Sequence, residues 1–222
     1  MVNDTIYKFD KHCNPLPYYG NTIISYLNDE KYPIFLAAKK IQSEIKSMEF
    51  SDHLAFLPPD SFHMTVLTLC REIDRHTQYW PPMVPQNAKF KEVDRTLKEI
   101  VDKIPVPKDV WIEVDECEIT RIVLKPADET SSRKLLNYRD QVAEKTGILH
   151  SWHKGFRYHL SLDYLVKPFN MEQEEIKQQV CAEFTNRLKR EIKPFILTKP
   201  EFAIFNDMMS YERNIELRGN QY

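Results

Sequence analysis

The stretch Ser61-Phe62-His63-Met64-Thr65-Val66-Leu67 has the same pattern as a second stretch, Arg157-Tyr158-His159-Leu160-Ser161-Leu162-Asp163. Each contains a histidine, an apolar residue and a hydroxyl residue in succession, within a run whose apolar residues alternate as in a β-strand. Successive side chains of a strand point to opposite faces, so that each histidine shares a face with its hydroxyl residue. The sequence therefore predicts two strands with one buried apolar face and one face that carries imidazole and hydroxyl groups.

The two stretches occupy equivalent places in the two halves of the chain. Their histidines are 159 − 63 = 96 residues apart, close to half of the 222 residues. In each half, a strand and a helix precede the histidine strand and another helix follows it. We expect strands over residues 21–27, 53–57, 61–69, 110–117, 119–124, 156–166, 195–205 and 211–217, and helices over residues 33–48, 90–104, 131–145 and 171–192. Ser131 or Ser132 can cap the third of these helices, and Gly147 can end it. This order indicates an internal structural duplication.

The composition is that of an ordinary soluble protein and bounds the function. The chain is 42% hydrophobic and 29% charged, and its net charge of −2 gives no global basic field for non-specific nucleic-acid binding. No run approaches membrane-spanning length, and the first residues lack a signal-peptide pattern. The four cysteines have no Cys-x-x-Cys spacing, which favours reduced thiols in a cytoplasmic protein over a zinc site or disulfides.

The doubled motif resembles the two-histidine (2H) phosphoesterases, which include RNA 2′,3′-cyclic phosphodiesterases and 2′-5′ RNA ligase-like proteins. Leu57-Pro58-Pro59 ahead of the first motif fits this resemblance. Three further segments look closer to a little-characterised branch of the superfamily, namely Gly20-Asn21-Thr22, Tyr79-Trp80-Pro81 and Phe205-Asn206-Asp207-Met208. Ser161 stands where threonine is commoner in the family, but it keeps the hydroxyl group.

The resemblance implies an α+β fold with a bilobal pseudo-twofold duplication. Two antiparallel β-sheets would form a central groove, with helices packed outside and one motif contributed by each lobe. We expect a single domain over residues 1–222, with an N-terminal extension at 1–19 and motif-bearing halves at about 20–108 and 109–222.

The residues of the two motifs suit acid–base chemistry at a phosphoester. Histidine titrates near neutrality, so His63 and His159 can hold opposite protonation states, one as base and one as acid. Thr65 and Ser161 can donate hydrogen bonds to the phosphoryl oxygens. This chemistry requires no metal ion or other cofactor. Which histidine is the base depends on the ester oxygen that leaves, and the sequence leaves this open.

Six further residues are candidates for substrate contact, each with a plainer alternative. Aromatic rings could stack on a base, arginines could bind phosphate oxygens and an acidic residue on the motif face could orient an imidazole. The alternatives are that the aromatic rings pack in the core, that the arginines are surface residues and that the acidic residue is a solvated strand end. These residues are Tyr26, Tyr79, Trp152, Arg71, Arg157 and Asp163. His150 and His153 have a helical metal-ligand spacing but are expected in a loop, which disfavours metal binding.

The sequence therefore favours a metal-independent phosphodiesterase that acts on a cyclic phosphate or a small nucleotide ester. A 2′-5′ RNA ligase, a nuclease or a hydrolase of cyclic nucleotide signals are alternatives within the enzymes. A nucleotide- or RNA-end-binding module without turnover is an alternative of another class, and so is the plain reading of each motif as a solvent-facing strand. The expected partner is a small nucleotide or cyclic phosphate, or RNA ends, bound to a monomer that does not associate with membranes.

Overall fold

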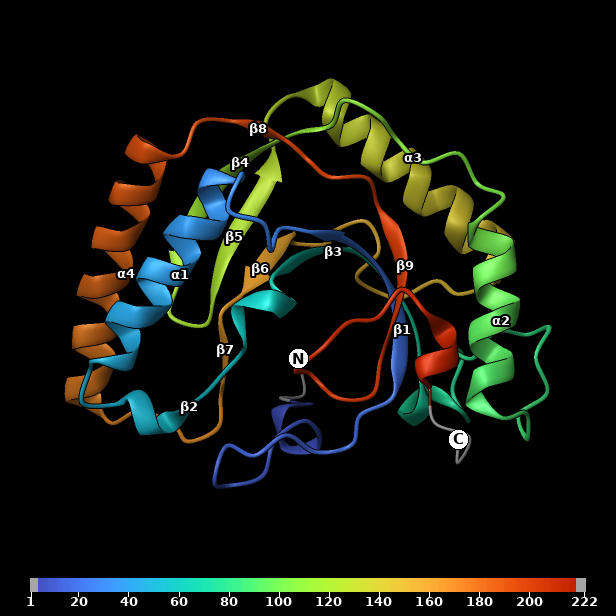
Figure 1. Ribbon diagram of the computed structural model, residues 1–222, viewed down its shortest axis with the longest axis horizontal. Helices are drawn as coiled ribbons and strands as arrows, with labels where there is room; N and C mark the ends of the chain where they lie inside the picture. The colour runs from blue at the N-terminus through green and yellow to red at the C-terminus, as the bar shows by residue number, and fades with distance from the viewer. Residues whose placement is uncertain (1–3, 219–222) are drawn as a thin grey trace.

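One antiparallel sheet of seven strands organises the chain (Figure 1). In the computed structural model, which describes residues 4–218, its strands follow the order β8-β4-β5-β6-β3-β1-β9. Their bounds are β1 (Gly20–Tyr26), β3 (His63–Arg71), β4 (Trp111–Glu118), β5 (Arg121–Pro126), β6 (His159–Ser161), β8 (Phe195–Ile196) and β9 (Glu201–Phe205). A separate two-stranded sheet contains β2 (Leu54–Phe56) and β7 (Asp163–Leu165).

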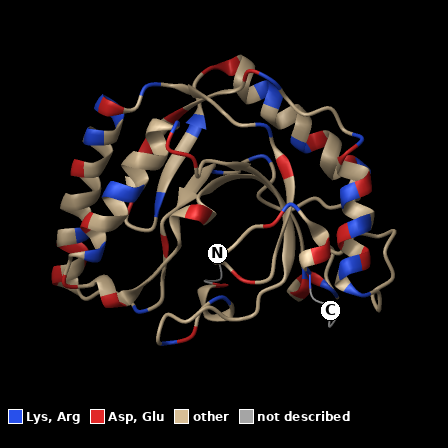
Figure 2. Cartoon of the chain, viewed as in Figure 1, with Lys and Arg blue, Asp and Glu red and all other residues tan. Residues whose placement is uncertain are grey.

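Four helices flank the curled sheet in two pairs (Figure 1). They are α1 (Pro33–Lys46), α2 (Phe90–Val101), α3 (Glu129–Thr146) and α4 (Met171–Glu191). An ion pair of 2.9 Å between Glu44 and Arg187 joins α1 to α4, while α2 packs against α3. Acidic and basic residues are interspersed along the outer helices (Figure 2), as expected of faces that contact water.

The α+β class, the antiparallel pairing and the external helices are confirmed, but the two halves do not form two separate sheets. The strands of the two halves meet at β3 and β6, so that both halves contribute to one continuous sheet. The two halves are also joined at one edge of the sheet, because β9 from the end of the chain pairs with β1 from its beginning. Among residues 4–218, no helix has both the length and the apolar character needed to cross a bilayer.

Several predicted boundaries differ from the structure for local reasons. The predicted strand over 156–166 is interrupted at Leu162 and forms β6 and β7 in different sheets. The strand predicted over 195–205 likewise divides into β8 and β9. The segment 211–217 is not a strand, because only Glu212 bridges to β9 before the 3₁₀ helix Ile215–Leu217.

The ends of α3 are set by one acidic residue and one glycine. The Asp128 side chain accepts a hydrogen bond of 2.6 Å from the backbone of Ser131, so Asp128 is the N-cap and the expected cap at Ser131 or Ser132 is wrong. Gly147 ends the helix with φ of 69°, as predicted, since glycine adopts this left-handed conformation without a Cβ penalty.

Two segments outside the sheet lie between the helix pairs (Figure 1). The N-terminal arm, residues 4–19, packs Phe9 into the core with its ring 5.3 Å from that of Tyr164. The backbone of Tyr18 donates to the carbonyl of Asn206, at the start of the C-terminal loop, residues 206–214. The N-terminal arm therefore wraps the fold, and it lies on the same side of the sheet as the C-terminal loop.

A buried ion pair fixes the end of the described chain. Arg218 and Asp94 of α2 are joined by bonds of 2.7 and 3.0 Å, and both side chains are fully buried. Arg218 also donates to the carbonyls of Gly20 and Phe205, which belong to β1 and β9. This side chain therefore ties the C-terminal segment to a helix and to two strands at once.

Candidate active site

The two motifs lie on neighbouring strands of the main sheet. Strands β3 and β6 are antiparallel, with Met64 opposite Leu160. Continuing this register by one residue in each direction places His63 opposite Ser161 and Thr65 opposite His159. These four side chains share the face opposite to the fully buried Met64 and Leu160. The two histidines are diagonal neighbours, which in an antiparallel sheet are roughly 7–8 Å apart, with their Cβ atoms somewhat closer.

The two histidines hold their rings in the same way. Nδ1 of His63 donates to the carbonyl of Ser61 at 2.6 Å, and Nδ1 of His159 donates to the carbonyl of Arg157 at 2.9 Å. In each case the acceptor lies two residues earlier in the chain. Because a carbonyl only accepts, Nδ1 carries the hydrogen and Nε2 is the nitrogen left for proton exchange with a ligand.

His63 is covered by an aromatic side chain from the C-terminal loop. The ring of Tyr211 lies 4.1 Å from the imidazole, measured between centroids, and His63 is only 8% exposed. Burial lowers the pKa of His63 to about 4, and the proximity of His159 contributes in the same direction. His63 is therefore neutral near pH 7 in the free protein, as a general base must be.

His159 has more charged neighbours and is partly exposed. Burial lowers its pKa, with Arg121 and Lys8 acting in the same direction, whereas Glu118 raises it. Arg121 pairs with Ser161 across β5 and β6 and therefore shares the motif face. Its guanidinium group also binds Glu118 at 2.7 Å.

The N-terminal arm brings a lysine to this site. The Lys8 ammonium group binds Asp4 at 3.0 Å and lies 5.4 Å and 4.8 Å from the ring centroids of Tyr18 and Tyr164. Its electrostatic effect on His159 places it near the second motif. The arm therefore contributes a cation and two aromatic contacts to the surroundings of the histidines.

Two β-bulges change which residues of β3 reach the motif face. Pairing with β1 shifts register twice, and the partly exposed residues of β3 become Thr65, Thr68 and Arg71, three residues apart. A regular strand would instead expose every second residue. The bulges thus align Thr68 and Arg71 with the motif, which strict alternation does not predict.

Two of the six proposed substrate-contacting residues lie beside the motifs but are already engaged. Tyr26 pairs with His63 across β1 and β3, yet its hydroxyl donates to the Tyr211 carbonyl and Arg213 covers its ring at 3.8 Å. Arg157 precedes His159 and forms ion pairs with Glu116 and with Glu118. Tyr26 therefore acts as a wall of the site, and Arg157 is a surface arginine whose carbonyl orients His159.

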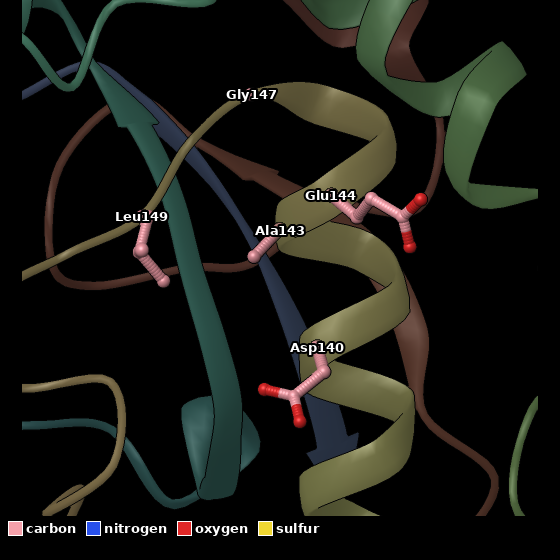
Figure 3. A pocket seen from close by; sticks show the side chains of 5 residues that line it. All are labelled: Asp140, Ala143, Glu144, Gly147 and Leu149. Atoms are coloured by element: carbon pink, nitrogen blue, oxygen red, sulfur yellow. The ribbon is translucent and has the colours of Figure 1, made fainter.

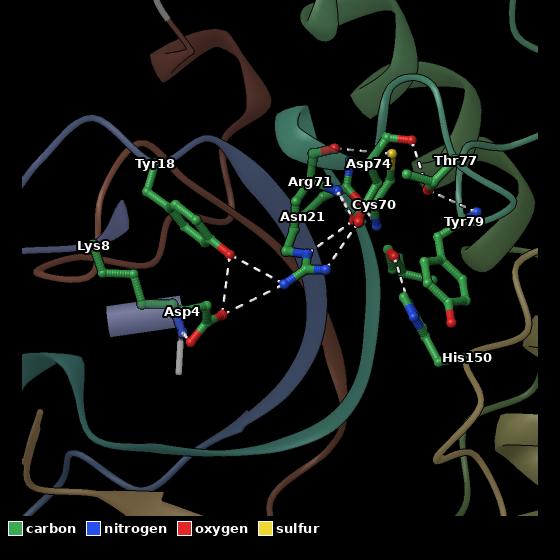
Figure 4. Close-up of polar contacts among 11 residues, drawn as sticks. Asp4, Lys8, Tyr18, Asn21, Cys70, Arg71, Asp74, Thr77, Tyr79 and His150 are labelled. Carbon is green, nitrogen blue, oxygen red and sulfur yellow. Dashed lines mark hydrogen bonds and ion pairs between the residues drawn. The ribbon is translucent and has the colours of Figure 1, made fainter. Parts of the chain in front are cut away.

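Arg71 lies further along β3 and is held by acidic partners (Figure 4). It forms two bonds of 2.9 Å with Asp74, donates to the Tyr18 hydroxyl at 3.1 Å and lies 3.6 Å from Asp4. Arg71 thus joins β3 to the N-terminal arm, and its charge is balanced by carboxylates.

Tyr79 and Trp152 come together, but around a different residue. The ring of His150 lies 4.5 Å from each of theirs, measured between centroids, and the two rings lie 5.9 Å from each other. Nε2 of His150 donates to the Leu69 carbonyl at 3.0 Å (Figure 4). Leu69 is six residues along β3 from His63. This cluster closes the edge of β3 beyond its pairing with β6 and is separate from the motifs.

The prediction that Asp163 shares a face with His159 is wrong. The break at Leu162 between β6 and β7 ends the alternation, and Asp163 is only 2% exposed. Its electrostatic neighbours are Lys46 of α1, Cys117 of β4 and Cys181 of α4. The alternative of a solvated strand end is wrong as well.

Other polar clusters and hollows lie away from the motifs. His153 contacts Asp140 of α3 through Nε2 at 2.7 Å. Within residues 4–218, no group of three or more histidine, cysteine, aspartate or glutamate side chains has an arrangement that could hold a metal ion. An open depression of about 450 Å³ lies at the end of α3, and its lining consists of Asp140, Ala143, Glu144, Gly147 and Leu149 (Figure 3).

Sequence reasoning missed four residues near the histidines: Lys8, Glu118, Arg121 and Tyr211. Each reaches the site through an interstrand register or a wrapping segment, which local patterns do not encode.

Two comparisons with known proteins, one with family models and one with solved structures, show what the chain is similar to. A family model described as "2H-phosphodiest: Domain of unknown function (DUF1868)" matches residues 8–123, just over half of the chain. The chain belongs to this 2H phosphodiesterase family. The match includes the first motif, whereas the second motif lies beyond it. A comparison with curated proteins gives no match.

Solved structures extend the likeness over most of the chain. The conserved protein of unknown function ATU0111 from Agrobacterium tumefaciens str. C58 is 25% identical with a TM-score of 0.87, over 92% of this chain and 88% of its own. A phosphoesterase is 12% identical over 88% and 94%, with a TM-score of 0.47. LigT of E. coli, complexed with phosphate, is 11% identical over 85% and 87%, with a TM-score of 0.40.

Proposed function

We propose that this 2H phosphodiesterase family member hydrolyses a cyclic phosphate or a small nucleotide phosphodiester without a metal ion. The observation that carries the proposal is the matched pair of histidines on β3 and β6. Both rings are fixed by an Nδ1 bond to the carbonyl two residues earlier, and both leave Nε2 for proton exchange. Two imidazoles held in this way can act together on one phosphate group.

The reaction needs one neutral and one protonated histidine. The neutral imidazole takes a proton from water, whose oxygen forms the new bond to phosphorus. The bond from phosphorus to one ester oxygen breaks, and the protonated imidazole gives its proton to that oxygen. Thr65 and Ser161 donate hydrogen bonds to the non-bridging oxygens, where charge develops.

The charges around the motifs favour a small substrate with one negative charge. Three nearby cations have carboxylate partners: Lys8 binds Asp4, Arg121 binds Glu118, and Arg71 binds Asp74. A protonated histidine supplies one positive charge, which matches the single charge of a cyclic phosphodiester. A long nucleic-acid strand would instead require a series of unpaired cations along its path.

A binding module without turnover is the second candidate, and one observation favours it. Tyr211 and the rest of its surroundings leave only 8% of His63 exposed, which restricts access to one of the two imidazoles. Such a protein would bind a phosphate ester or an RNA end and release it unchanged.

Hydrolysis of 2′,3′-cyclic nucleotides in the presence of EDTA distinguishes the two candidates. We expect turnover by the wild-type protein, and loss of most of it in His63→Ala and in His159→Ala. His53→Ala is a matched control, because His53 belongs to the segment before β2, where its Nδ1 contacts the Pro168 carbonyl. Binding without hydrolysis across a panel of cyclic mononucleotides, short oligonucleotides and ADP-ribose-type cyclic phosphates would support the binding module.

A further inference from the structure

The two histidines occupy equivalent positions on their strands, but their surroundings differ. Both lie on the motif face, and each donates a hydrogen bond from Nδ1 to a backbone carbonyl. His63 is covered by the ring of Tyr211 at 4.1 Å, whereas His159 is partly exposed and has Glu118 as an electrostatic neighbour. The pseudo-twofold duplication is thus broken by a residue of the C-terminal loop, which belongs to neither motif.

We propose that Tyr211 is a positioning residue that makes His63 the general base and leaves His159 as the general acid. This inference rests on the proposed function and assigns the two roles within the same site. Tyr211 acts through His63, by removing water from one side of its imidazole, and does not itself exchange a proton.

The proposal follows from comparing the cost of a protonated imidazole at His63 with its cost at His159. An imidazolium group at His63 would face three groups: the Tyr211 ring, the Tyr26 side chain on β1 and the imidazole of His159. None of these groups is anionic near pH 7. Burial raises the pKa of both phenols, that of Tyr26 to about 12, so neither supplies a counter-charge. The neutral imidazole is therefore favoured at His63.

Burial also lowers the pKa of His159, but this histidine has charged neighbours of both signs. Arg121 and Lys8 oppose protonation, but each is neutralised by a carboxylate, Glu118 at 2.7 Å and Asp4 at 3.0 Å respectively. Glu118 favours protonation of His159, and water reaches this partly exposed ring more readily than the buried ring of His63. The shared proton of the pair therefore resides on His159.

The Tyr211 ring could also change the pKa of His63 in the opposite direction, through a cation–π interaction, and this alternative can be tested. The face of an aromatic ring attracts a cation, so the Tyr211 ring could instead stabilise a protonated His63. Removing the ring then lowers the pKa of His63, whereas removing a ring that excludes water raises it. The direction of the shift decides between the two effects.

The experiment is an NMR pH titration of isotopically labelled histidines in the full chain, for wild type, Tyr211→Phe and Tyr211→Ala. We expect Tyr211→Ala to raise the pKa of His63 by about one unit or more, while Tyr211→Phe leaves it unchanged. The signal of His53 serves as an internal reference. If Tyr211→Ala loses its dispersed spectrum, Tyr211→Val replaces it, with a smaller shift in the same direction.

A profile of kcat/KM against pH completes the test. We expect its acidic limb to follow the pKa of His63 and to move upward in Tyr211→Ala. An unchanged or lowered pKa of His63, or an acidic limb that follows His159, overturns the assignment. Because the titration needs no substrate, absence of any hydrolysis would count against the proposed function alone and leave the effect of Tyr211 measured.

Discussion

Met64 and Leu160 lie opposite each other across β3 and β6, and this single pair determines where both histidines point. Both side chains are fully buried, so the register is held by the core. A slip by one residue would exchange the faces of a strand and bury its histidine. The motif therefore depends on apolar residues that take no part in the proposed chemistry.

The pH dependence of turnover should follow from the lowered pKa values of both histidines. Burial lowers the pKa of His63 to about 4 and also lowers that of His159 from 6.5. A reaction that needs one neutral and one protonated imidazole is fastest between the two values. We expect a bell-shaped profile of kcat/KM with its maximum on the acidic side of 6.5, whose limbs report the coupled pair. A maximum above pH 7.5 would contradict this prediction.

The two hydroxyl groups should contribute comparably to turnover. Thr65→Val and Ser161→Ala each remove one donor from the motif face, and loss of a preorganised donor costs about 10²–10³-fold. The shape of the pH profile should not change, because neither hydroxyl titrates near neutrality. Steady-state kinetics at several pH values measures both effects. Thr68→Val is a matched control, because Thr68 is also a partly exposed threonine of β3 but lies five residues beyond His63. A Thr65→Val protein with full turnover would mean that Thr65 has no role beyond that of a strand residue.

The sequence was informative where a residue's role is local and uninformative where it depends on distant segments. Alternation predicted the shared face of His63 and Thr65, and glycine chemistry predicted the end of α3 at Gly147. Alternation failed at Leu162, where the strand changes sheets and turns Asp163 away from the motif. It also failed along β3, because bulges are set by pairing with β1.

The surroundings of the motifs depend on contacts between residues far apart in the chain. Tyr211 lies 148 positions beyond His63, and Lys8 reaches His159 only because the N-terminal arm wraps the fold. No periodicity links such residues. The family resemblance could place the histidines, but the acid–base assignment required the packed structure.

Arg218 should be essential for stability. Its guanidinium group is fully buried with Asp94, so Arg218→Met would leave an unpaired buried carboxylate, at a cost of about 3–5 kcal/mol. Urea denaturation measures the loss in free energy of unfolding. Arg95→Met is the matched control: Arg95 is half exposed and pairs with Glu216 at the surface, a kind of pair that contributes about 0–1 kcal/mol. Equal losses in the two variants would contradict the anchoring role of Arg218.

Asp163 should make the protein less stable as the pH rises. Among the described residues, neither of its carboxylate oxygens has a hydrogen-bond partner, and burial raises its pKa well above 3.8, with only Lys46 opposing. A group whose pKa is higher in the folded state binds more protons there than in the unfolded chain. Its favourable contribution is therefore complete below about pH 3.8 and is lost as the pH rises through the folded-state pKa.

Asp163→Asn removes this titration while keeping the size and shape of the side chain. We expect the difference in melting temperature, variant minus wild type, to increase between pH 4 and pH 8. Each pKa unit corresponds to about 1.4 kcal/mol, and about 1 kcal/mol shifts the melting temperature of a chain of this size by about 2–4 °C. Calorimetry at several pH values measures the difference, and Asp60→Asn, in the 3₁₀ helix Pro59–Ser61, controls for the loss of a carboxylate elsewhere. A difference that is constant with pH would mean that Asp163 is ionised in the folded protein, with a partner such as Lys46 or water compensating its charge.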